Sequence, residues 1–191
     1  MLKQMSLLKQ VTLVLASVTL LAAPAPAQVP DQVPIPAVTG TIGLDGTIDK
    51  FYGVSHRALV KTADGVRHVV HFTGRTSVHG TQHTLDDPFG GLEEGSMVAV
   101  HYVANGNTKE AIEVDRVGDG GLSVVDGTVM DVDRERKRLT IQIADDKRVT
   151  LRLTDRAAND VGKDVKAQAR VIVYYADDGG DLVAHYFRKA K

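Results

Sequence analysis

The sequence predicts an all-β protein made of two tandem five-stranded β-barrels, OB-like or alternatively SH3-like, behind a cleaved signal peptide. Three observations support this prediction. One module is written twice, short segments of each copy alternate apolar and polar residues, and turn-forming residues separate those segments. The repeat sets the number of domains, and the alternation sets their class.

The repeat is clearest at Asp126-Gly127-Thr128-Val129, which follows the pattern of Asp45-Gly46-Thr47-Ile48. From Asp45 to Arg75, each residue aligns without a gap with the residue 81 positions later. The later part of the module aligns at a separation of 73, so the first copy has eight more residues between Arg75 and Met97. A duplication explains both alignments.

Residues 1–27 have the features of an export signal. Two lysines precede an apolar run over residues 11–23, and Ala25-Pro26-Ala27 offers a small-x-small cleavage site. A membrane anchor would need about 20 apolar residues, and this run is shorter and is followed by prolines. We therefore expect cleavage near Ala27 and a mature periplasmic or secreted protein without a transmembrane anchor.

The next segment, residues 28–40, is expected to be a tether. Its prolines Pro30, Pro34 and Pro36 favour extended chain over packed structure. The sequence contains no cysteine, so it can carry neither a lipid-modified cysteine nor a disulfide. Packing alone must stabilise the folded parts.

The first barrel is assigned to residues 41–118 and the second to residues 122–191. Gly118-Asp119-Gly120-Gly121 is expected to be a flexible hinge between them. Because the hinge is so short, the barrels should touch without forming one core.

Each copy is expected to contain three meandering strands, a crossover and a final hairpin. The second strand shows the alternation best, with Leu139, Ile141 and Ile143 on one face. Turn residues such as Asp64-Gly65 join the strands, and Asp145-Asp146 is its less favourable counterpart. The predicted strands are residues 46–51 and 127–132, then 58–62 and 139–143, then 67–72 and 148–153, then 98–102 and 171–175, and last 111–114 and 184–187.

The crossovers, Thr73 to Gly95 and Thr154 to Ala169, are expected to be non-strand, with part forming a short helix. Three meandering strands, a crossover and a two-stranded hairpin occur in this order in an OB-like barrel, with an SH3-like barrel as the close alternative. Closure into a barrel also removes exposed sheet edges.

Both copies share a short pattern: a glycine two residues before a valine or isoleucine in the first strand, a threonine after the third strand, a later Val-x-Val and an alanine near the end. In the first copy the later residues are Thr73, Val98, Val100 and Ala111. In this pattern the chain resembles a family of small exported bacterial β-barrel domains described only as a domain of unknown function. The resemblance covers nearly all the mature chain and brings no established activity. The second copy lacks a clear Leu-x-x-Gly-x-x-Val before its fourth strand.

The residue types that most enzymes need occur in unsuitable places. The mature chain has few serines, none in a nucleophile-elbow context, and no cysteine nucleophile. The glycine pairs fall at hairpins rather than at strand-to-helix junctions, which excludes a phosphate loop. Paired carboxylates such as Asp86-Asp87 lie in predicted turns, where solvated carboxylates are common. We therefore expect a non-enzymatic protein without a cofactor.

Basic residues gather at two places in the second copy, and both could contact an anionic polymer. One is the tip between its first two strands, and the other is the C-terminal tail. An OB-like barrel can bind single strands through a basic groove with exposed aromatics, here Tyr174 and Tyr186. Export argues against nucleic acid, and a formal net charge of −1 gives no global attraction to it. An anionic envelope polymer would use the same charges, which are Arg134, Arg136, Lys137, Arg138, Arg188, Lys189 and Lys191.

Histidines are concentrated in the first copy, which has six of the seven. Strand parity places His71 and His101 outward, whereas His68 should point inward. His79 and His83 lie in the eight-residue excess of the crossover, with Asp86 close by. Neutral imidazoles with a carboxylate suit zinc or copper(II). The candidate metal residues are His71, His79, His83 and His101, although no tight ligand motif accompanies them.

These observations predict a periplasmic or secreted binding or interaction module without enzymatic activity. Its partner would be an envelope protein, a polymer or a small ligand, with no nucleic acid. The longer crossover of the first copy should carry specificity, because loops on rigid scaffolds commonly hold binding residues. Three alternatives stay open: a zinc or copper carrier using the first-barrel histidines, a binder of an anionic envelope polymer, and a structural spacer.

Overall fold

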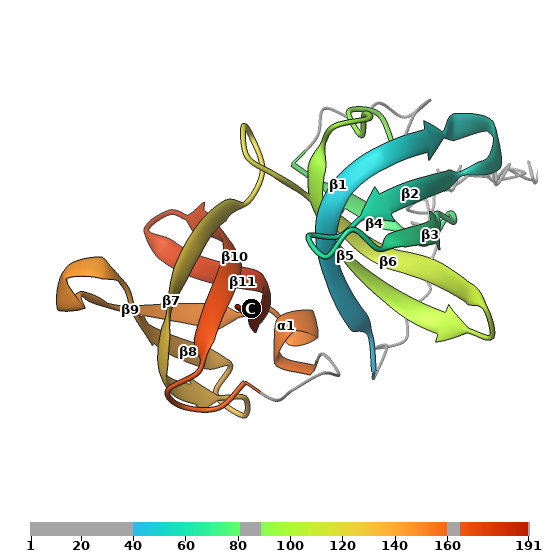
Figure 1. Ribbon diagram of the computed structural model, residues 1–191. Coiled ribbons are helices and arrows are strands. Elements are labelled where there is room, and N and C mark those ends of the chain that lie inside the picture. The colour runs from blue at the N-terminus through green and yellow to red at the C-terminus, as the bar shows by residue number, and fades with distance from the viewer. Residues whose placement is uncertain (1–39, 81–88, 160–164, 191) are drawn as a thin grey trace, which may run out of the picture. The chain divides into compact units, whose positions relative to one another are not determined.

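The computed structural model describes residues 40–80, 89–159 and 165–190 (Figure 1). The predicted signal peptide, and all but the last residue of the predicted tether, lie outside the described residues. Strands are the main secondary structure of the described chain, β1 to β6 in the first copy and β7 to β11 in the second. This confirms the all-β class that the alternation predicts.

The first barrel closes through five strands. Hydrogen bonds join them in the order β3-β2-β1-β5-β6, and a parallel pairing between β3 and β6 completes the ring. A short additional strand in the crossover, β4 (Ser77–His79), pairs in parallel with a later part of β6. The five strands of the ring are β1 (Ile42–Tyr52), β2 (Arg57–Lys61), β3 (Arg67–His71), β5 (Met97–Asn105) and β6 (Thr108–Val117).

The second barrel closes in the same way. Its ring runs β10-β11-β9-β8-β7, with β9 and β11 parallel. One short helix, α1 (Asp155–Asn159), lies in its crossover. The strands are β7 (Ser123–Asp133), β8 (Arg138–Gln142), β9 (Arg148–Leu153), β10 (Arg170–Asp178) and β11 (Asp181–Lys189).

The pairing of the third strand with the fifth decides between the two predicted barrels. In both copies the order around the ring is first, second, third, fifth, fourth, and the closing pair is parallel. This is the Greek-key closure of an OB-fold barrel. The protein therefore consists of two OB-like barrels.

Irregularities in the sheets recur at aligned positions. The pairing of β1 with β2 shifts register between Ile48 and Lys50, and that of β7 with β8 shifts 81 positions later. The β5–β6 hairpin shifts between His101 and Tyr102, and the β10–β11 hairpin shifts 73 positions later. The bulges bend the long strands so that each can take part in closing its barrel.

The glycine of the repeated Asp-Gly-Thr sequence is required by a close backbone approach. A Cβ atom at Gly46 would lie 2.4 Å from the carbonyl oxygen of Lys61, and one at Gly127 would lie 2.7 Å from that of Gln142. Both distances are shorter than any side chain allows. The same close contact with the backbone of the second strand thus explains why both copies have glycine at this position.

Both crossovers begin with a threonine and end in a similar turn, but their middle parts differ in secondary structure. Thr154 caps α1, since its hydroxyl accepts a hydrogen bond from the backbone N–H of Ala157 at 3.1 Å. This confirms a short helix in the second crossover, whereas the first contains β4. Both crossovers end with a buried apolar residue, Leu92 or Val165, three positions before a left-handed residue.

That left-handed residue is Gly95 in the first copy and Gln168 in the second. Each donates its backbone N–H to a carbonyl of the first strand of its own barrel, at 2.8 Å and 2.7 Å. The second copy therefore retains the structural arrangement of Leu-x-x-Gly-x-x-Val, with Val165 in place of the leucine and Gln168 in place of the glycine.

The barrels have separate cores and meet through a third buried apolar cluster. The first core is built around Ile48 and Val100, and the second around Leu139 and Val173. The third cluster contains residues from both copies, namely Ala99, Leu122, Tyr174 and Tyr186. The two sheets do not merge in the described residues, so the barrels touch without one common core.

The predicted hinge, residues 118–121, forms a hydrogen-bonded turn. The N–H of Gly121 donates to the carbonyl of Gly118 at 2.7 Å, and the N–H of Leu122 donates to the carbonyl of Arg116 at 2.8 Å. A Cβ atom at Gly121 would lie 2.0 Å from that Arg116 oxygen. These glycines thus permit a tight turn between the two barrels.

Within the described ranges, no helix is long and apolar enough to cross a membrane.

Candidate binding sites between the two barrels

A buried polar network links the repeated aspartate of the first barrel to the hairpin of the second. Asp45 Oδ2 accepts a hydrogen bond from the Tyr174 hydroxyl at 2.6 Å, and Asp45 Oδ1 lies 2.6 Å from Arg188 Nε. Burial raises the pKa of Tyr174 above its ordinary value, and the hydrogen bond to the Asp45 carboxylate is the second cause. The tyrosine therefore remains a hydrogen-bond donor at physiological pH.

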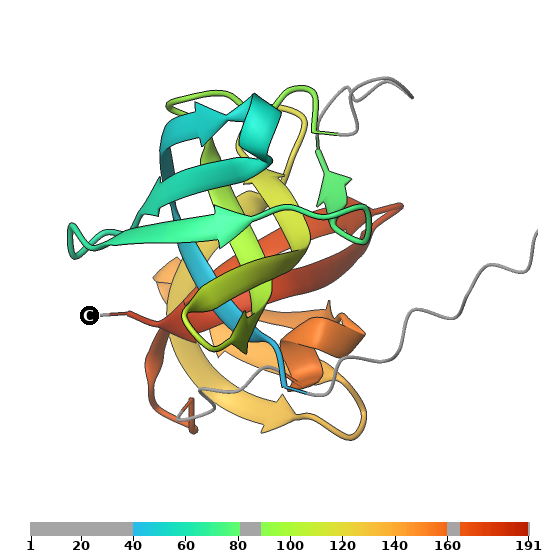
Figure 2. The same ribbon diagram turned by 90° about the vertical axis from the view of Figure 1, so that its right-hand side faces the viewer.

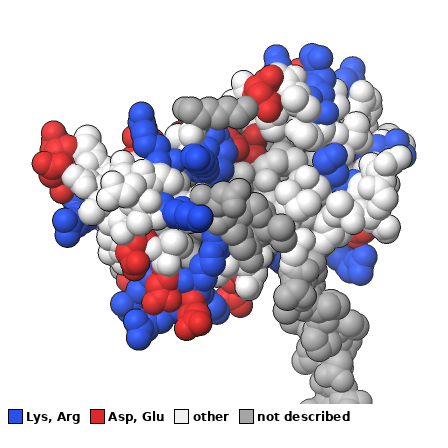
Figure 3. Space-filling view, turned by 60° about the horizontal axis from the view of Figure 1, so that its bottom comes forward, with Lys and Arg blue, Asp and Glu red and all other residues white. Residues whose placement is uncertain are grey.

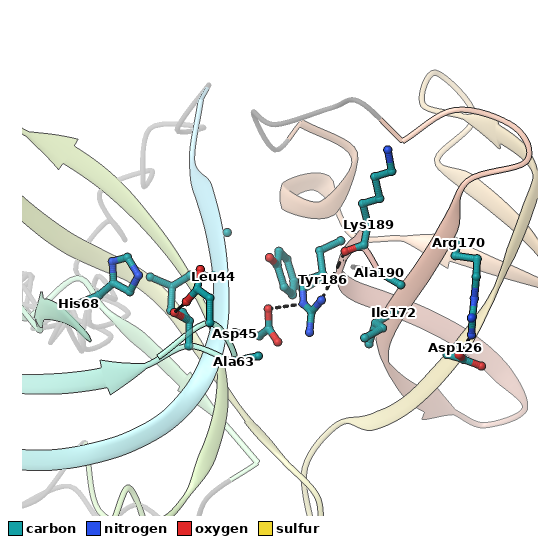
Figure 4. Close-up of a pocket in the computed structure, with 14 residues that line it drawn as sticks. Leu44, Asp45, Ala63, His68, Asp126, Arg170, Ile172, Tyr186, Lys189 and Ala190 are labelled. Carbon is teal, nitrogen blue, oxygen red and sulfur yellow. Dashed lines mark hydrogen bonds and ion pairs between the residues drawn. The ribbon is translucent and has the colours of Figure 1, made fainter. Parts of the chain in front are cut away.

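Beside this network lies a cavity of about 520 Å³ (Figure 4). Its volume is within the range of small-ligand pockets. Leu44 and Ala63 approach it from the first barrel, and Ile172 and Tyr186 from the second. Its lining also includes the polar residues Asp45, Asp64, His68, Asp126, Arg170, Arg188 and Lys189.

His68 provides a neutral polar group in this cavity. Burial lowers the pKa of His68 below its ordinary value, and the positive charge of Lys109 adds to the effect against the opposing Asp64. The ring shares one side of β3 with the buried Val70. An uncharged imidazole can donate and accept hydrogen bonds at the same site.

The charges around the cavity largely compensate one another. Arg188 is paired with Asp45, and Arg170 lies 2.5 Å from a carboxylate oxygen of Asp126. Figure 3 shows that basic and acidic side chains are also interspersed on the face of the molecule that it presents. The arrangement favours a ligand without large net charge.

A second cluster gathers titratable groups from three strands. His79 is on β4, Glu113 and Asp115 are on β6, and His185 is on β11, beside β4 in the view of Figure 2. His79 Nε2 lies 3.6 Å from Glu113 Oε1, and His185 Nδ1 lies 3.3 Å from Asp115 Oδ1 and 3.9 Å from Glu113 Oε1. The adjacent Asp115 raises the pKa of His185, against the effect of burial.

This cluster borders a small cavity of about 170 Å³. His79, Asp115 and His185 line it, and Gly80 and Gly121 bring two backbone segments together beside it. Arg156 of α1 contacts the other Glu113 oxygen, Oε2, and so orients this carboxylate toward the histidines.

Three of the four predicted metal residues, His71, His79 and His101, lie in the described part of the chain, and they do not form one metal-compatible group. Of them, only His79 belongs to a metal-compatible group in the part of the chain that the structure describes. His71 is partly exposed on β3, and His83 lies outside the described residues, as does Asp86. His101 was expected to be an accessible outward residue, but it is 1% exposed.

The second barrel covers His101, which is why strand parity alone misjudged it. Its Nε2 lies 3.0 Å from the carbonyl oxygen of His185, and its ring packs edge-on against Tyr186. The ring does point away from the first core, as parity predicts. The opposing copy of the module then buries it.

Tyr174 and Tyr186 do not form an exposed aromatic surface. They are 1% and 6% exposed, and their ring centroids are 5.5 Å apart. The stacking surface considered for single strands is therefore occupied by the contact between the barrels. Charges at the tip between β7 and β8 are also engaged, since Lys137 pairs with Asp155 and Arg136 with Asp133.

Sequence reasoning missed Glu113, Asp115 and His185 as a group. The two acids are two positions apart on a strand, which places them on one face. That spacing is common on solvated strands, and only the contact between the barrels brings His185 to them. His185, like His56 and His68, was not among the predicted metal residues.

Comparisons with family models and with curated proteins found no match. Among solved structures, silver-bound CusF is 17% identical with a TM-score of 0.31, covering 36% of this chain and 97% of its own. Apo-CusF from Escherichia coli is 18% identical with a TM-score of 0.30, covering 37% and 90%. Drosophila Unr CSD456 is 12% identical with a TM-score of 0.35, covering 78% and 61%. The sites must therefore be interpreted from their own residues.

Proposed function

We propose that the protein is an exported, non-enzymatic binding module of the exported β-barrel family that it resembles, and that a small uncharged amphipathic ligand occupies the 520 Å³ cavity. The observation behind this proposal is the cavity itself, which is lined by apolar and polar side chains of both barrels. The volume of this cavity, about 520 Å³, is in the range of small-ligand sites.

The chemistry of the lining supports an amphipathic ligand. Leu44 and Ile172 offer apolar surface to the body of the ligand, and the neutral ring of His68 offers a hydrogen bond to its polar end. A charged ligand would compete with the ion pairs of Arg170 and Arg188. An uncharged ligand leaves those pairs intact.

The test uses N-phenyl-1-naphthylamine, an uncharged fluorescent dye with a large apolar surface. Titration of the protein without residues 1–27 should give a saturable increase in fluorescence with one dye bound per chain. Ala63 is exposed in a turn at the cavity, so Ala63→Trp should fill the space without disturbing either core. We expect this variant to lower dye affinity at least tenfold.

Ala144→Trp is the matched control, because Ala144 is the aligned position of the second copy and does not line this cavity. It should bind the dye as the wild type does. Equal binding by wild type and Ala63→Trp would place the dye elsewhere and contradict the proposal, as would the absence of saturable binding.

A further inference from the structure

Four side chains with metal-binding atoms converge where β4 and β6 of the first barrel meet β11 of the second. They are His79, Glu113, Asp115 and His185, and the ligand atoms of the first three all lie within 4.8 Å of one another. The set combines two imidazoles with two carboxylates. Imidazole nitrogen and carboxylate oxygen are ligands that zinc accepts in proteins.

Asp115 is the observation that distinguishes this cluster from an ordinary surface group. It is 1% exposed, and neither of its carboxylate oxygens has a hydrogen-bond partner among the described residues. A buried carboxylate without hydrogen bonds is costly, and native proteins rarely retain one without a reason. His185 Nδ1 is also without a hydrogen bond in this part of the chain, although it lies close to Asp115.

The spacing between these atoms suits a shared ion better than direct hydrogen bonds. The nitrogen-to-oxygen distances are 3.3, 3.6 and 3.9 Å. A tetrahedron with metal–ligand bonds of about 2.0–2.1 Å has edges of roughly 3.3 Å between its ligands. The side chains thus stand close to the separations that a tetrahedral ion requires, beside a 170 Å³ cavity from which an ion can enter.

We propose that His79, Glu113, Asp115 and His185 form a zinc site that bridges the two barrels. Two carboxylates neutralise the charge of the dication, and two neutral imidazoles complete four-coordination. Calcium and magnesium prefer all-oxygen ligand sets, and this set contains no thiolate or thioether for copper(I). Arg156 holds the remaining Glu113 oxygen and positions the carboxylate from outside the ion's ligand set.

The site has a mechanical consequence, because its ligands come from both copies. Zinc would add bonds between β6 and β11 that the free protein lacks. An ion that binds only the folded, docked state stabilises it in proportion to the logarithm of its concentration over Kd. Zinc should therefore raise the melting temperature of the docked pair of barrels.

The experiment is calorimetric titration of zinc chloride into untagged protein lacking residues 1–27, with melting temperature measured in parallel. We expect one zinc ion per chain and a higher melting temperature. His79→Gln should lower zinc affinity at least tenfold and remove the thermal shift. Since His79 has 53% of its side chain exposed, this substitution should leave the fold intact.

Two further histidine variants locate the ion. His71→Gln lies outside the cluster and should bind zinc as the wild type does. His83→Gln should do the same. Loss of binding in either of these variants, with retention in His79→Gln, would overturn the assignment, and so would a wild-type protein that binds no zinc.

Asp115→Asn tests the buried ligand. We expect weaker zinc binding, because the amide of asparagine is a poorer zinc ligand than a carboxylate. If the variant binds zinc as the wild type does, Asp115 is not a ligand and the proposed site is wrong. The naphthylamine titration is independent of this result, because its cavity shares no lining residue with the cluster.

Discussion

Gln168 adopts a backbone conformation that favours glycine, and the aligned residue of the first copy is glycine. The φ angles are 73° at Gln168 and 92° at Gly95. Left-handed backbone costs a residue with a side chain roughly 1–2 kcal/mol. The second copy therefore stores strain at a position where the first has none.

Gln168→Gly should stabilise the second barrel by about 0.5–1 kcal/mol, because relief of the strain exceeds the added entropy of the unfolded chain. Urea denaturation would measure the difference. The reciprocal Gly95→Gln should destabilise the first barrel. A Gln168→Gly protein that unfolds at lower urea would show that the glutamine side chain stabilises the crossover more than its backbone strain costs.

The turn between the barrels is an element whose glycines have different roles. Gly121 has no room for a side chain, whereas a Cβ at Gly120 would meet nothing within 4 Å and Gly120 is limited only by its φ of 75°. Lack of space therefore excludes a side chain at Gly121, whereas the backbone angle alone disfavours one at Gly120.

Gly121→Ala should destabilise the protein by about 2 kcal/mol or more, since it displaces the Arg116 carbonyl from its hydrogen bond with Leu122. Gly120→Ala should cost only about 1 kcal/mol, through its backbone angle. Chemical denaturation of both variants tests this order. Equal effects would indicate that the turn moves freely enough to accept a Cβ at Gly121.

Strand positions could be predicted from the sequence because alternation and turn residues are local properties. Residues 58–62 were predicted as a strand and β2 spans Arg57–Lys61, while residues 148–153 match β9. The first strands proved longer, because β1 extends back to Ile42 to pair with β5. Such pairing depends on tertiary contacts.

The candidate sites could not be predicted from the sequence, because they too depend on tertiary contacts. His101 follows the predicted parity, yet its burial depends on a barrel that is distant in sequence. The convergence of His185 with Asp115 depends on the register of two barrels against each other, which no local pattern encodes. Of the predicted metal residues that the structure describes, His79 alone lies in the cluster that it brings together.

At the scale of the whole molecule, the bond between Tyr174 and Asp45 crosses from one barrel to the other. Tyr174→Phe removes a buried hydrogen bond to a charged group and should lower the free energy of unfolding by about 1.5–3 kcal/mol. Scanning calorimetry would measure the loss. Tyr175→Phe, at the neighbouring and more exposed tyrosine, is the control, and an equal effect of both would show that the contact with Asp45 contributes nothing special.

The third apolar cluster has a consequence for the origin of the chain. Ala99 of the first barrel and Ile172 of the second both pack in it, and they are equivalent residues, 73 positions apart. His101 and Tyr174 are equivalent as well, and each is 1% exposed. The copies thus face each other through one and the same patch, as the subunits of a two-fold homodimer do. In a homodimer both subunits must carry the same residue at each position of the patch. After fusion of two such subunits into one chain, the two copies could diverge, so that Asp115 of one copy has Arg188, of opposite charge, as its equivalent in the other.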